Sequence, residues 1–173
     1  PLGALRRVFG PAASREAAVE AILYNYEIDP AFPDAVRAAA QAAPEQVGPG
    51  EREGRLDLRD KLIFTIDGAS AKDLDDAVSL EQDEQGRWVL GVHIADVGHY
   101  VPAASPLDLE AWERGTSVYF ADRVVPMLPP ELSNGICSLN PRVDRLTLSC
   151  LMTLTAEGEL VGHTIAKSVI RTV

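Results

Sequence analysis

The sequence predicts an α+β protein in which a helical N-terminal lead-in precedes a mainly antiparallel or mixed sheet. Apolar residues recur at helical spacing near the start of the chain, whereas from residue 51 on they mostly alternate with polar residues, as in strands. Short polar turns separate several of the strand-like segments into pairs. Hydrophobic residues make up 46% of the 173 residues and charged residues 24%, which is typical of a folded globular chain.

The first fifty residues predict two helices and a linker. Ser14 is a suitable N-cap for a helix over residues 15–27, whose apolar side chains fall on one face. A second helix is expected over residues 34–43, because a proline precedes it and alanine dominates it. Residues 44–50 are rich in proline and glycine, as turns are. Residues 1–50 are therefore expected to form a helical linker ahead of the main domain.

Residues 51–173 are expected to form the sheet. Turn residues around Gly86 and Gly158 each join two alternating segments, which indicates two hairpins. Ser105 is an N-cap followed by proline and, at the third helical position, an acid, so a helix is expected there. A run containing three prolines cannot continue a hydrogen-bonded ladder. The expected strands are 62–67, 77–80, 88–95, 118–120, 146–155 and 160–170, the helix is 106–114, and the loop is 125–130.

Charge and cysteine content limit the classes of function. The formal net charge is −10, which is unusual for a protein that grips nucleic acid through its phosphates, so any such function needs a separate source of positive charge. Cys137 and Cys150 suggest no disulfide framework and are expected to be buried, reduced thiols of a cytoplasmic protein. No apolar run approaches membrane-spanning length, so we expect no membrane partner.

Four aspartates within ten residues are the strongest chemical signal. Asp67, Asp73, Asp75 and Asp76 follow an apolar strand-like segment. Crowded carboxylates repel one another unless a cation neutralises them. Gly68 and the small residues after it let the backbone turn tightly and bring the first aspartate back beside the other three. We therefore expect a cage of oxygen ligands around a divalent metal, which points to phosphate chemistry.

The identity of that metal follows from its donors. Oxygen-only ligands favour a hard cation, Mg²⁺ first and Mn²⁺ second. A dedicated calcium loop is disfavoured because Ala77 stands where its third acidic ligand belongs. The competing interpretation is an acidic surface turn without a ligand, since runs of charge are usually solvated. The position of the cluster directly after an apolar segment favours the functional interpretation.

Several further motifs accompany the aspartates, and together they resemble the start of the RNB catalytic domain of the ribonuclease R and ribonuclease II family, nearest to bacterial ribonuclease R. The resemblance covers about residues 51–173, with the motifs in the family's order. These motifs are RLDLR at 55–59, FTIDG at 64–68, DLDD at 73–76, GVHIADV at 91–97, HYV at 99–101, PMLP at 126–129 and LSNGICSL at 132–139.

The resemblance implies a hydrolytic 3'-to-5' exoribonuclease that uses Mg²⁺ to degrade single-stranded RNA processively to nucleoside 5'-monophosphates. It assigns metal binding to Asp67, Asp73 and Asp76, and catalysis to Asp75 and Asp76, with no departure from the family's acids. It also places Tyr119 where an aromatic ring stacks on an RNA base, although a core tyrosine on a short strand is the plain alternative.

The resemblance further implies that the chain is a piece of a longer protein. Residues 51–173 would be the N-terminal portion of the catalytic domain, and residues 1–50 would join it to upstream OB-type RNA-binding modules. The absent portion would supply an arginine at the attacked phosphate, further RNA contacts and a downstream OB-type module. We therefore expect the fragment alone to be inactive, with much of the RNA-binding positive charge elsewhere.

Two other functions compete with the nuclease. A non-catalytic RNA-binding or scaffold relative would be expected to lose part of the acid cluster, which is intact here. A phosphatase with an aspartate nucleophile would use Asp73 and Asp75, but it requires the first aspartate at the end of an apolar strand, and residues 70–72 do not form one.

The remaining candidates have ordinary structural interpretations. His93, Asp96 and His99 do not have a recognised zinc spacing, so we expect structural histidines with hydrogen-bonded partners. Trp112 is expected in the core. The unranked candidates for phosphate contacts are Arg55, Arg59, Lys72, Arg114, Arg123, Arg142 and Arg145.

Overall fold

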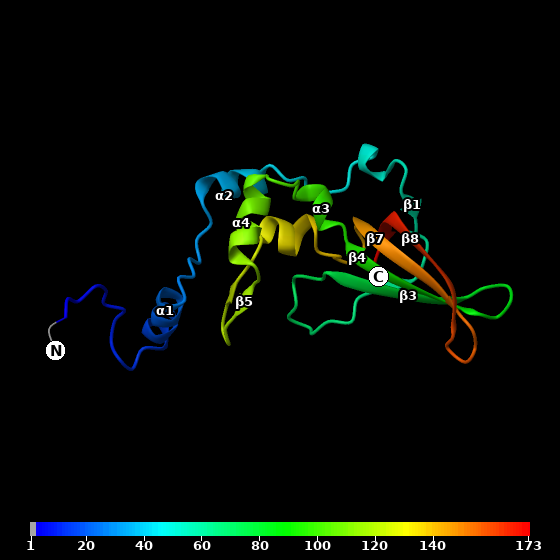
Figure 1. Ribbon diagram of the computed structural model, residues 1–173. Helices are drawn as coiled ribbons and strands as arrows, with labels where there is room; N and C mark the ends of the chain where they lie inside the picture. The colour runs from blue at the N-terminus through cyan, green and yellow to red at the C-terminus, as the bar shows by residue number, and fades with distance from the viewer. Residues whose placement is uncertain (1–2) are drawn as a thin grey trace.

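The computed structural model describes residues 3–173 and contains one large sheet with most of the helices beyond one end of it (Figure 1). Its strands are β1 (Leu56–Asp57), β2 (Ile63–Phe64), β3 (Asp76–Gln82), β4 (Trp88–Ala95), β7 (Asp144–Leu154) and β8 (Leu160–Arg171). They are ordered β1-β8-β7-β4-β3-β2. All neighbours are antiparallel except β1 and β8, which are parallel. The α+β class with a mainly antiparallel sheet is confirmed.

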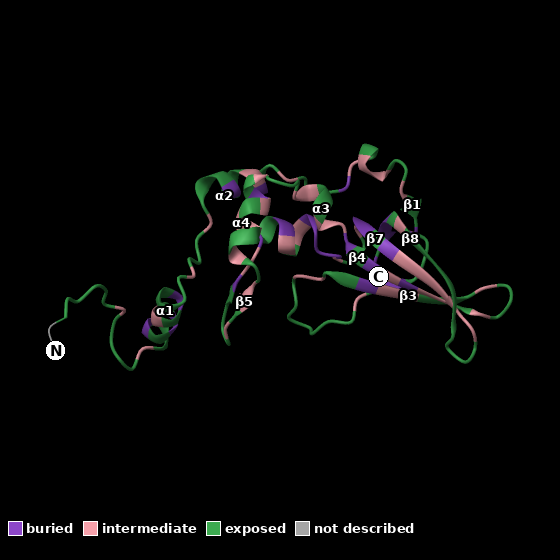
Figure 2. Cartoon of the chain, viewed as in Figure 1, coloured by how far each residue is buried: buried purple, intermediate pink, exposed green. Residues whose placement is uncertain are grey.

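Two hairpins, β3–β4 and β7–β8, form the centre of the sheet as predicted. Asp83 closes the first turn, because its carboxylate accepts hydrogen bonds from two backbone N–H groups of the turn. Gly158 in the second turn has a φ of 87°, a left-handed conformation that glycine adopts without strain. The hairpin tips are exposed, whereas buried residues alternate with partly buried ones in the middle of β4 (Figure 2).

The strand predicted over residues 62–67 is wrong in length. Only Ile63 and Phe64 pair with β3, and the chain then leaves the sheet. Ile66 is 81% exposed, so the alternation of apolar residues continues past the point where hydrogen bonding to β3 stops. Alternation describes side chains, whereas a strand also requires a neighbour for its backbone groups.

The helices follow their caps. In the first helix, the Ser14 hydroxyl accepts a hydrogen bond from the N–H of Ala17 at 3.3 Å, and in the third predicted helix Ser105 accepts one from Asp108 at 3.2 Å. Gly115, with a φ of 70°, ends the latter. The three predicted helices are confirmed as α1 (Arg15–Asn25), α2 (Asp34–Gln41) and α4 (Pro106–Arg114). The structure also contains three short helical segments that were not predicted: η1 (Gly50–Arg52), α3 (Val97–Tyr100) and η2 (Glu131–Ile136).

A small second sheet consists of β5 (Val118–Tyr119) and β6 (Val124–Val125), which pair in antiparallel fashion. The strand predicted over residues 118–120 is thus present but ends one residue earlier. The loop predicted over residues 125–130 begins one residue too early, because Val125 is the last residue of β6; residues 126–129 then join no further strand, as expected from their prolines.

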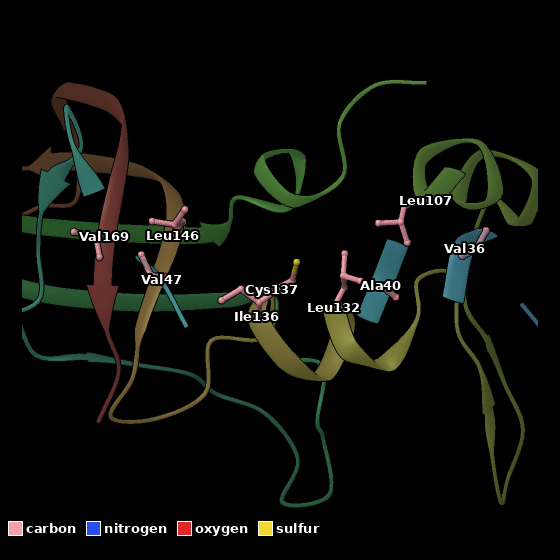
Figure 3. Close-up of a cluster of buried hydrophobic side chains, with 9 residues drawn as sticks. All are labelled: Val36, Ala40, Val47, Leu107, Leu132, Ile136, Cys137, Leu146 and Val169. Atoms are coloured by element: carbon pink, nitrogen blue, oxygen red, sulfur yellow. The ribbon is translucent and has the colours of Figure 1, made fainter. Parts of the chain in front are cut away.

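One hydrophobic cluster connects α2 to the sheet (Figure 3). Val36 and Ala40 of α2 belong to the same cluster as Leu107 of α4, Leu132 of η2 and Leu146 of β7. The second predicted helix therefore packs with the main domain, and its apolar face is the reason. The division at residue 50 stays a prediction about the longer protein.

Two burial predictions need correction. Trp112 is 87% exposed rather than in the core, because it lies five residues after the buried Leu107, about 140° around the helix. Cys150 is only partly buried, although Cys137 is buried and both thiols are free. Within residues 3–173, no helix has the length and apolar character needed to cross a membrane.

Candidate active site

The aspartate-rich segment between β2 and β3 is firmly held in its second half. The N–H of Ala95 in β4 donates to the carbonyl of Asp75 at 2.9 Å, and the N–H of Leu139 donates to the carbonyl of Leu74 at 2.8 Å. Asp76 is the first residue of β3. The backbone that carries the last three aspartates is therefore tied both to the sheet and to the segment after η2.

Asp67 lies in the first half of the segment, which has fewer anchors. There the N–H of Ala71 donates to the carbonyl of Gly68 at 2.9 Å and closes a tight turn. The turn that the small residues predicted is confirmed. Asp67 itself is exposed and lies outside any helix or strand.

The four carboxylates influence one another without forming a closed cage. Partial desolvation of the Asp75 carboxylate raises its pKa, although the residue as a whole is exposed, and the charges of Asp73, Asp76 and Asp67 raise that pKa further, in that order. In the part of the chain that the structure describes, no three histidine, cysteine or acidic side chains form a group that could hold a metal ion. The expected cage of oxygen ligands is thus not assembled in this arrangement. Mutual repulsion between like charges favours such a separation of carboxylates.

Tyr119 of β5 reaches the aspartates from the second sheet. Its hydroxyl donates a hydrogen bond to an Asp73 carboxylate oxygen at 2.9 Å, and this bond raises the pKa of the tyrosine. The residue is 64% exposed, which excludes the core position considered as an alternative. Much of the side chain is therefore accessible to a ligand beside the acids.

A cavity of about 340 Å³ lies where the two sheets meet at the aspartates. Acidic and hydroxyl side chains line part of it, and apolar side chains line the rest. Its lining includes Asp73, Asp75, Tyr119, Ile94, Val97 and Leu128. A groove next to it shares Asp73 and Tyr119 and is also lined by Gly68 and Lys72. The hydrogen-bonded pair of Asp73 and Tyr119 thus lies at the boundary between the cavity and the adjoining groove.

The two histidines singled out from the sequence are structural, as expected. His93 is fully buried, with its ring nitrogens 3.0 Å from the Ser79 hydroxyl and 2.7 Å from the Ser149 hydroxyl. His99 contacts Glu51 at 2.9 Å through its Nε2 atom. Asp96 pairs with Arg55 at 2.7 Å instead of joining the histidines. No metal site is therefore supported here.

Most basic candidates for phosphate contacts are already engaged. Arg145 donates only to backbone carbonyls, whereas Arg55, Arg59, Arg114 and Arg123 form ion pairs. Lys72 has no carboxylate within ion-pair distance among residues 3–173, and it lines the groove beside Asp73. Sequence reasoning did not rank Lys72, although its position directly before the aspartates was a usable signal.

The chain is similar to proteins of one family. Residues 55–173 match the RNB domain. Ribonuclease R 1 of Lactococcus lactis is 53% identical over 98% of this chain, and ribonuclease R of Escherichia coli is 46% identical over 98% of it. The chain spans 21% of the length of each of these relatives.

Solved structures show the same relationship. Mycoplasma genitalium RNase R in complex with ribose-methylated single-stranded RNA matches with a TM-score of 0.89 at 32% identity, over 96% of this chain and 26% of that chain. Yeast Ssd1, a pseudonuclease, matches with a TM-score of 0.80 at 20% identity, over 95% of this chain and 22% of that chain, and this likeness concerns the fold alone. The resemblance drawn from the sequence motifs is confirmed: the chain belongs to the RNB domain family, and it corresponds to part of a ribonuclease R-type protein.

Proposed function

We propose that this chain is part of the catalytic domain of a cytoplasmic, hydrolytic exoribonuclease that degrades single-stranded RNA from its 3' end to nucleoside 5'-monophosphates. The observation that carries the proposal is the cavity in which Asp73 and Asp75 face apolar side chains beside an exposed Tyr119. Relatives named ribonuclease R support it. Because the chain spans about a fifth of those relatives, the activity is proposed for the longer protein.

The cavity suits a nucleotide at the end of a strand. Its volume of about 340 Å³ and its largely apolar wall can enclose a base, and a nucleotide bound there would bring its phosphate to the aspartates. The exposed ring of Tyr119 can stack on a base of any identity, which suits an enzyme that moves along RNA. The hydrogen bond from Tyr119 to Asp73 fixes the position of the ring relative to the carboxylate.

Mg²⁺, which Mn²⁺ can replace, is the proposed cofactor. Asp67, Asp73 and Asp76 would hold it, and their donor chemistry fits because all three offer only oxygen. Among residues 3–173 no three such side chains form a group that could hold the ion, so binding would require the carboxylates to move closer together. A bound divalent cation supplies positive charge at the attacked phosphate. Asp75, whose backbone is fixed by Ala95, is proposed to act on the scissile phosphate, together with Asp76.

The alternative is a non-catalytic RNA-binding or scaffold protein with the same fold. Yeast Ssd1 is described as a pseudonuclease, so this architecture by itself does not distinguish an enzyme from a non-enzyme. The intact set of four aspartates and the exposed Tyr119 favour the enzyme. A phosphatase is disfavoured because the residues directly before Asp73 form no strand.

The test uses the full-length protein and 5'-labelled single-stranded RNA. Asp75→Asn keeps the side-chain shape but removes the charge, so we expect RNA hydrolysis to fall by at least about 100-fold while RNA binding changes little. Asp60→Asn is the matched control, because Asp60 is an exposed aspartate outside the site. Undiminished hydrolysis by Asp75→Asn contradicts the assigned role. RNA binding without any turnover by the unmutated protein favours the non-catalytic alternative.

The isolated 173-residue chain is proposed to be inactive. Four of its candidate phosphate-binding arginines are ion-paired and Arg145 bonds only to carbonyls, so the positive charge for RNA must come largely from the rest of the protein. OB-type modules flanking this region are the proposed source. Degradation of RNA by the purified chain in the presence of Mg²⁺ contradicts this proposal. Anomalous scattering from Mn²⁺ soaked into crystals of the full-length protein tests the metal site directly.

A further inference from the structure

Ser138, just after η2, is hydrogen-bonded to the aspartate segment. Its hydroxyl donates to the carbonyl of Lys72 at 2.8 Å and accepts from the N–H of Leu74 at 3.1 Å. The side chain is completely buried. One buried oxygen atom therefore fixes the backbone on both sides of Asp73, although the bonded residues are 64 and 66 positions away in the sequence.

A second pair of contacts reinforces this link. The N–H of Leu139 donates to the carbonyl of Leu74 at 2.8 Å, and both leucines belong to one hydrophobic cluster. Solvent is excluded, because Leu139 is also completely buried. We refer to Ser138 and Leu139, with the three hydrogen bonds that they form to residues 72–74, as the clasp.

Arg145 of β7 holds Ser138 from the other side. Its Nε atom donates to the carbonyl of Ser138 at 2.7 Å, and an Nη atom donates to the carbonyl of Gly135 at 3.2 Å. The residue is only 6% exposed. A buried guanidinium is costly unless its N–H groups are satisfied, so these carbonyls must stay in place. Hydrogen bonds thus link the central strand β7 through Ser138 to Lys72 and Leu74, the residues on either side of Asp73.

We propose that Ser138 is a positioning residue for Asp73 and Asp75, and that Arg145 holds Ser138 in place. The inference rests on the proposed nuclease function. The clasp fixes the backbone on both sides of Asp73, directly before Asp75. The hydrogen bond from the N–H of Ala95 fixes the backbone carbonyl of Asp75 itself. The backbone that carries Asp73 and Asp75 is therefore anchored to two different parts of the fold. Among residues 3–173, no hydrogen bond joins Asp67 to the clasp.

The chemistry of the site explains the choice of serine. Between Lys72 and Leu74 one group must accept from an N–H and donate to a carbonyl, which a hydroxyl does with a single atom. Alanine at residue 138 removes both bonds and leaves two backbone groups without this partner. Cysteine keeps a similar shape but hydrogen-bonds only weakly.

The first test measures turnover of single-stranded RNA by the full-length protein as a function of Mg²⁺ concentration. Loss of a group that orients ligands or reacting carboxylates commonly lowers metal affinity or rate by about 10- to 100-fold. For Ser138→Ala we expect kcat to fall in that range, with a higher Mg²⁺ requirement and KM for RNA changed by less than about threefold. Ser168→Ala is the matched control, because Ser168 is equally buried and hydrogen-bonded but lies in β8 away from the aspartates.

The second test does not depend on activity or metal. Hydrogen exchange of the full-length protein, followed by mass spectrometry without Mg²⁺, reports how tightly residues 72–76 are held. Ser138→Ala should exchange at least about tenfold faster there, whereas Ser168→Ala should match the unmutated protein in this segment. If Ser138→Ala does not fold, Ser138→Cys carries the same comparison and should give an intermediate loss.

The outcomes separate this inference from the proposed function. Normal kcat in Ser138→Ala, in a protein that degrades RNA, overturns the positioning role and leaves the nuclease intact. Equal losses in Ser138→Ala and Ser168→Ala also overturn it, because they indicate a general loss of stability. If the unmutated protein shows no turnover, the nuclease proposal fails and the positioning role fails with it, even where exchange shows that the clasp holds the backbone.

Discussion

Mild acid is expected to destabilise the sheet through His93, in the middle of β4. The ring is fully buried between the hydroxyls of Ser79 and Ser149, and burial lowers its pKa from 6.5 to about 4. In the unfolded chain the ring regains its ordinary pKa, so the unfolded state binds the proton more tightly. The stability that the neutral ring contributes is therefore complete above about pH 6.5 and is lost as the pH falls toward 4.

The magnitude follows from the two pKa values. At about 1.4 kcal/mol for each tenfold difference in proton affinity, lowering the pH from 7 to 5 should reduce the free energy of unfolding by about 2 kcal/mol. Protonation also makes both ring nitrogens donors, so one hydroxyl partner must give up the hydrogen bond that it donates. Carboxylates with lowered pKa values, such as Asp57 and Asp144, lose their contribution mainly below this window.

Two measurements check this prediction on the 173-residue chain. An NMR titration of the imidazole ring should show His93 without a transition near pH 6.5 in the folded state. Urea unfolding at pH 7 and pH 5 should show the loss of about 2 kcal/mol in the unmutated chain and a much smaller loss in His93→Gln. The other histidines are present in both proteins, so their effects cancel. A ring that titrates near pH 6.5, or an equal loss in His93→Gln, would refute the reasoning.

Two further predictions concern stability. Gly91→Ala places a Cβ atom against the Ser79 hydroxyl and 2.7 Å from the His93 ring, so urea unfolding should show that the free energy of unfolding falls by about 1–3 kcal/mol. Gly162→Ala is the control, because its Cβ atom would have no atom within 4 Å, and its free energy of unfolding should fall by less than about 1 kcal/mol. Equal losses would contradict the steric argument. The Asp144 carboxylate is shared by the guanidinium groups of Arg52, Arg59 and Arg171. Because Asp144→Asn leaves these three groups without that carboxylate, it should lower the free energy of unfolding by about 2–3 kcal/mol, and the difference should be smaller in 1 M salt. An unchanged unfolding midpoint would contradict this prediction.

The local features of the fold were predictable from the sequence. Ser14 and Ser105 cap the helices that begin after them, and the turns around Gly86 and Gly158 join the two central hairpins. The tight turn after Asp67 also follows from local composition. In each case the interacting groups lie within a few residues of one another, so backbone preference and hydrogen bonding over that distance decide the outcome.

Other features depend on groups that are distant in the sequence. The residue type of Ser138 gives no sign that it bonds to Lys72 and Leu74, because packing of η2 against the sheet brings them together. The exposure of Trp112 likewise depends on which face of α4 meets its neighbours.

The sequence by itself determined the family, the four aspartates and the oxygen chemistry that they offer. Only the tertiary structure decided that Asp73 shares a cavity with Tyr119, that Lys72 lies beside them in the adjoining groove, and that the carboxylates stand apart. The physical reason is that residue types specify which interactions are available, whereas charge repulsion and long-range packing decide which side chains meet.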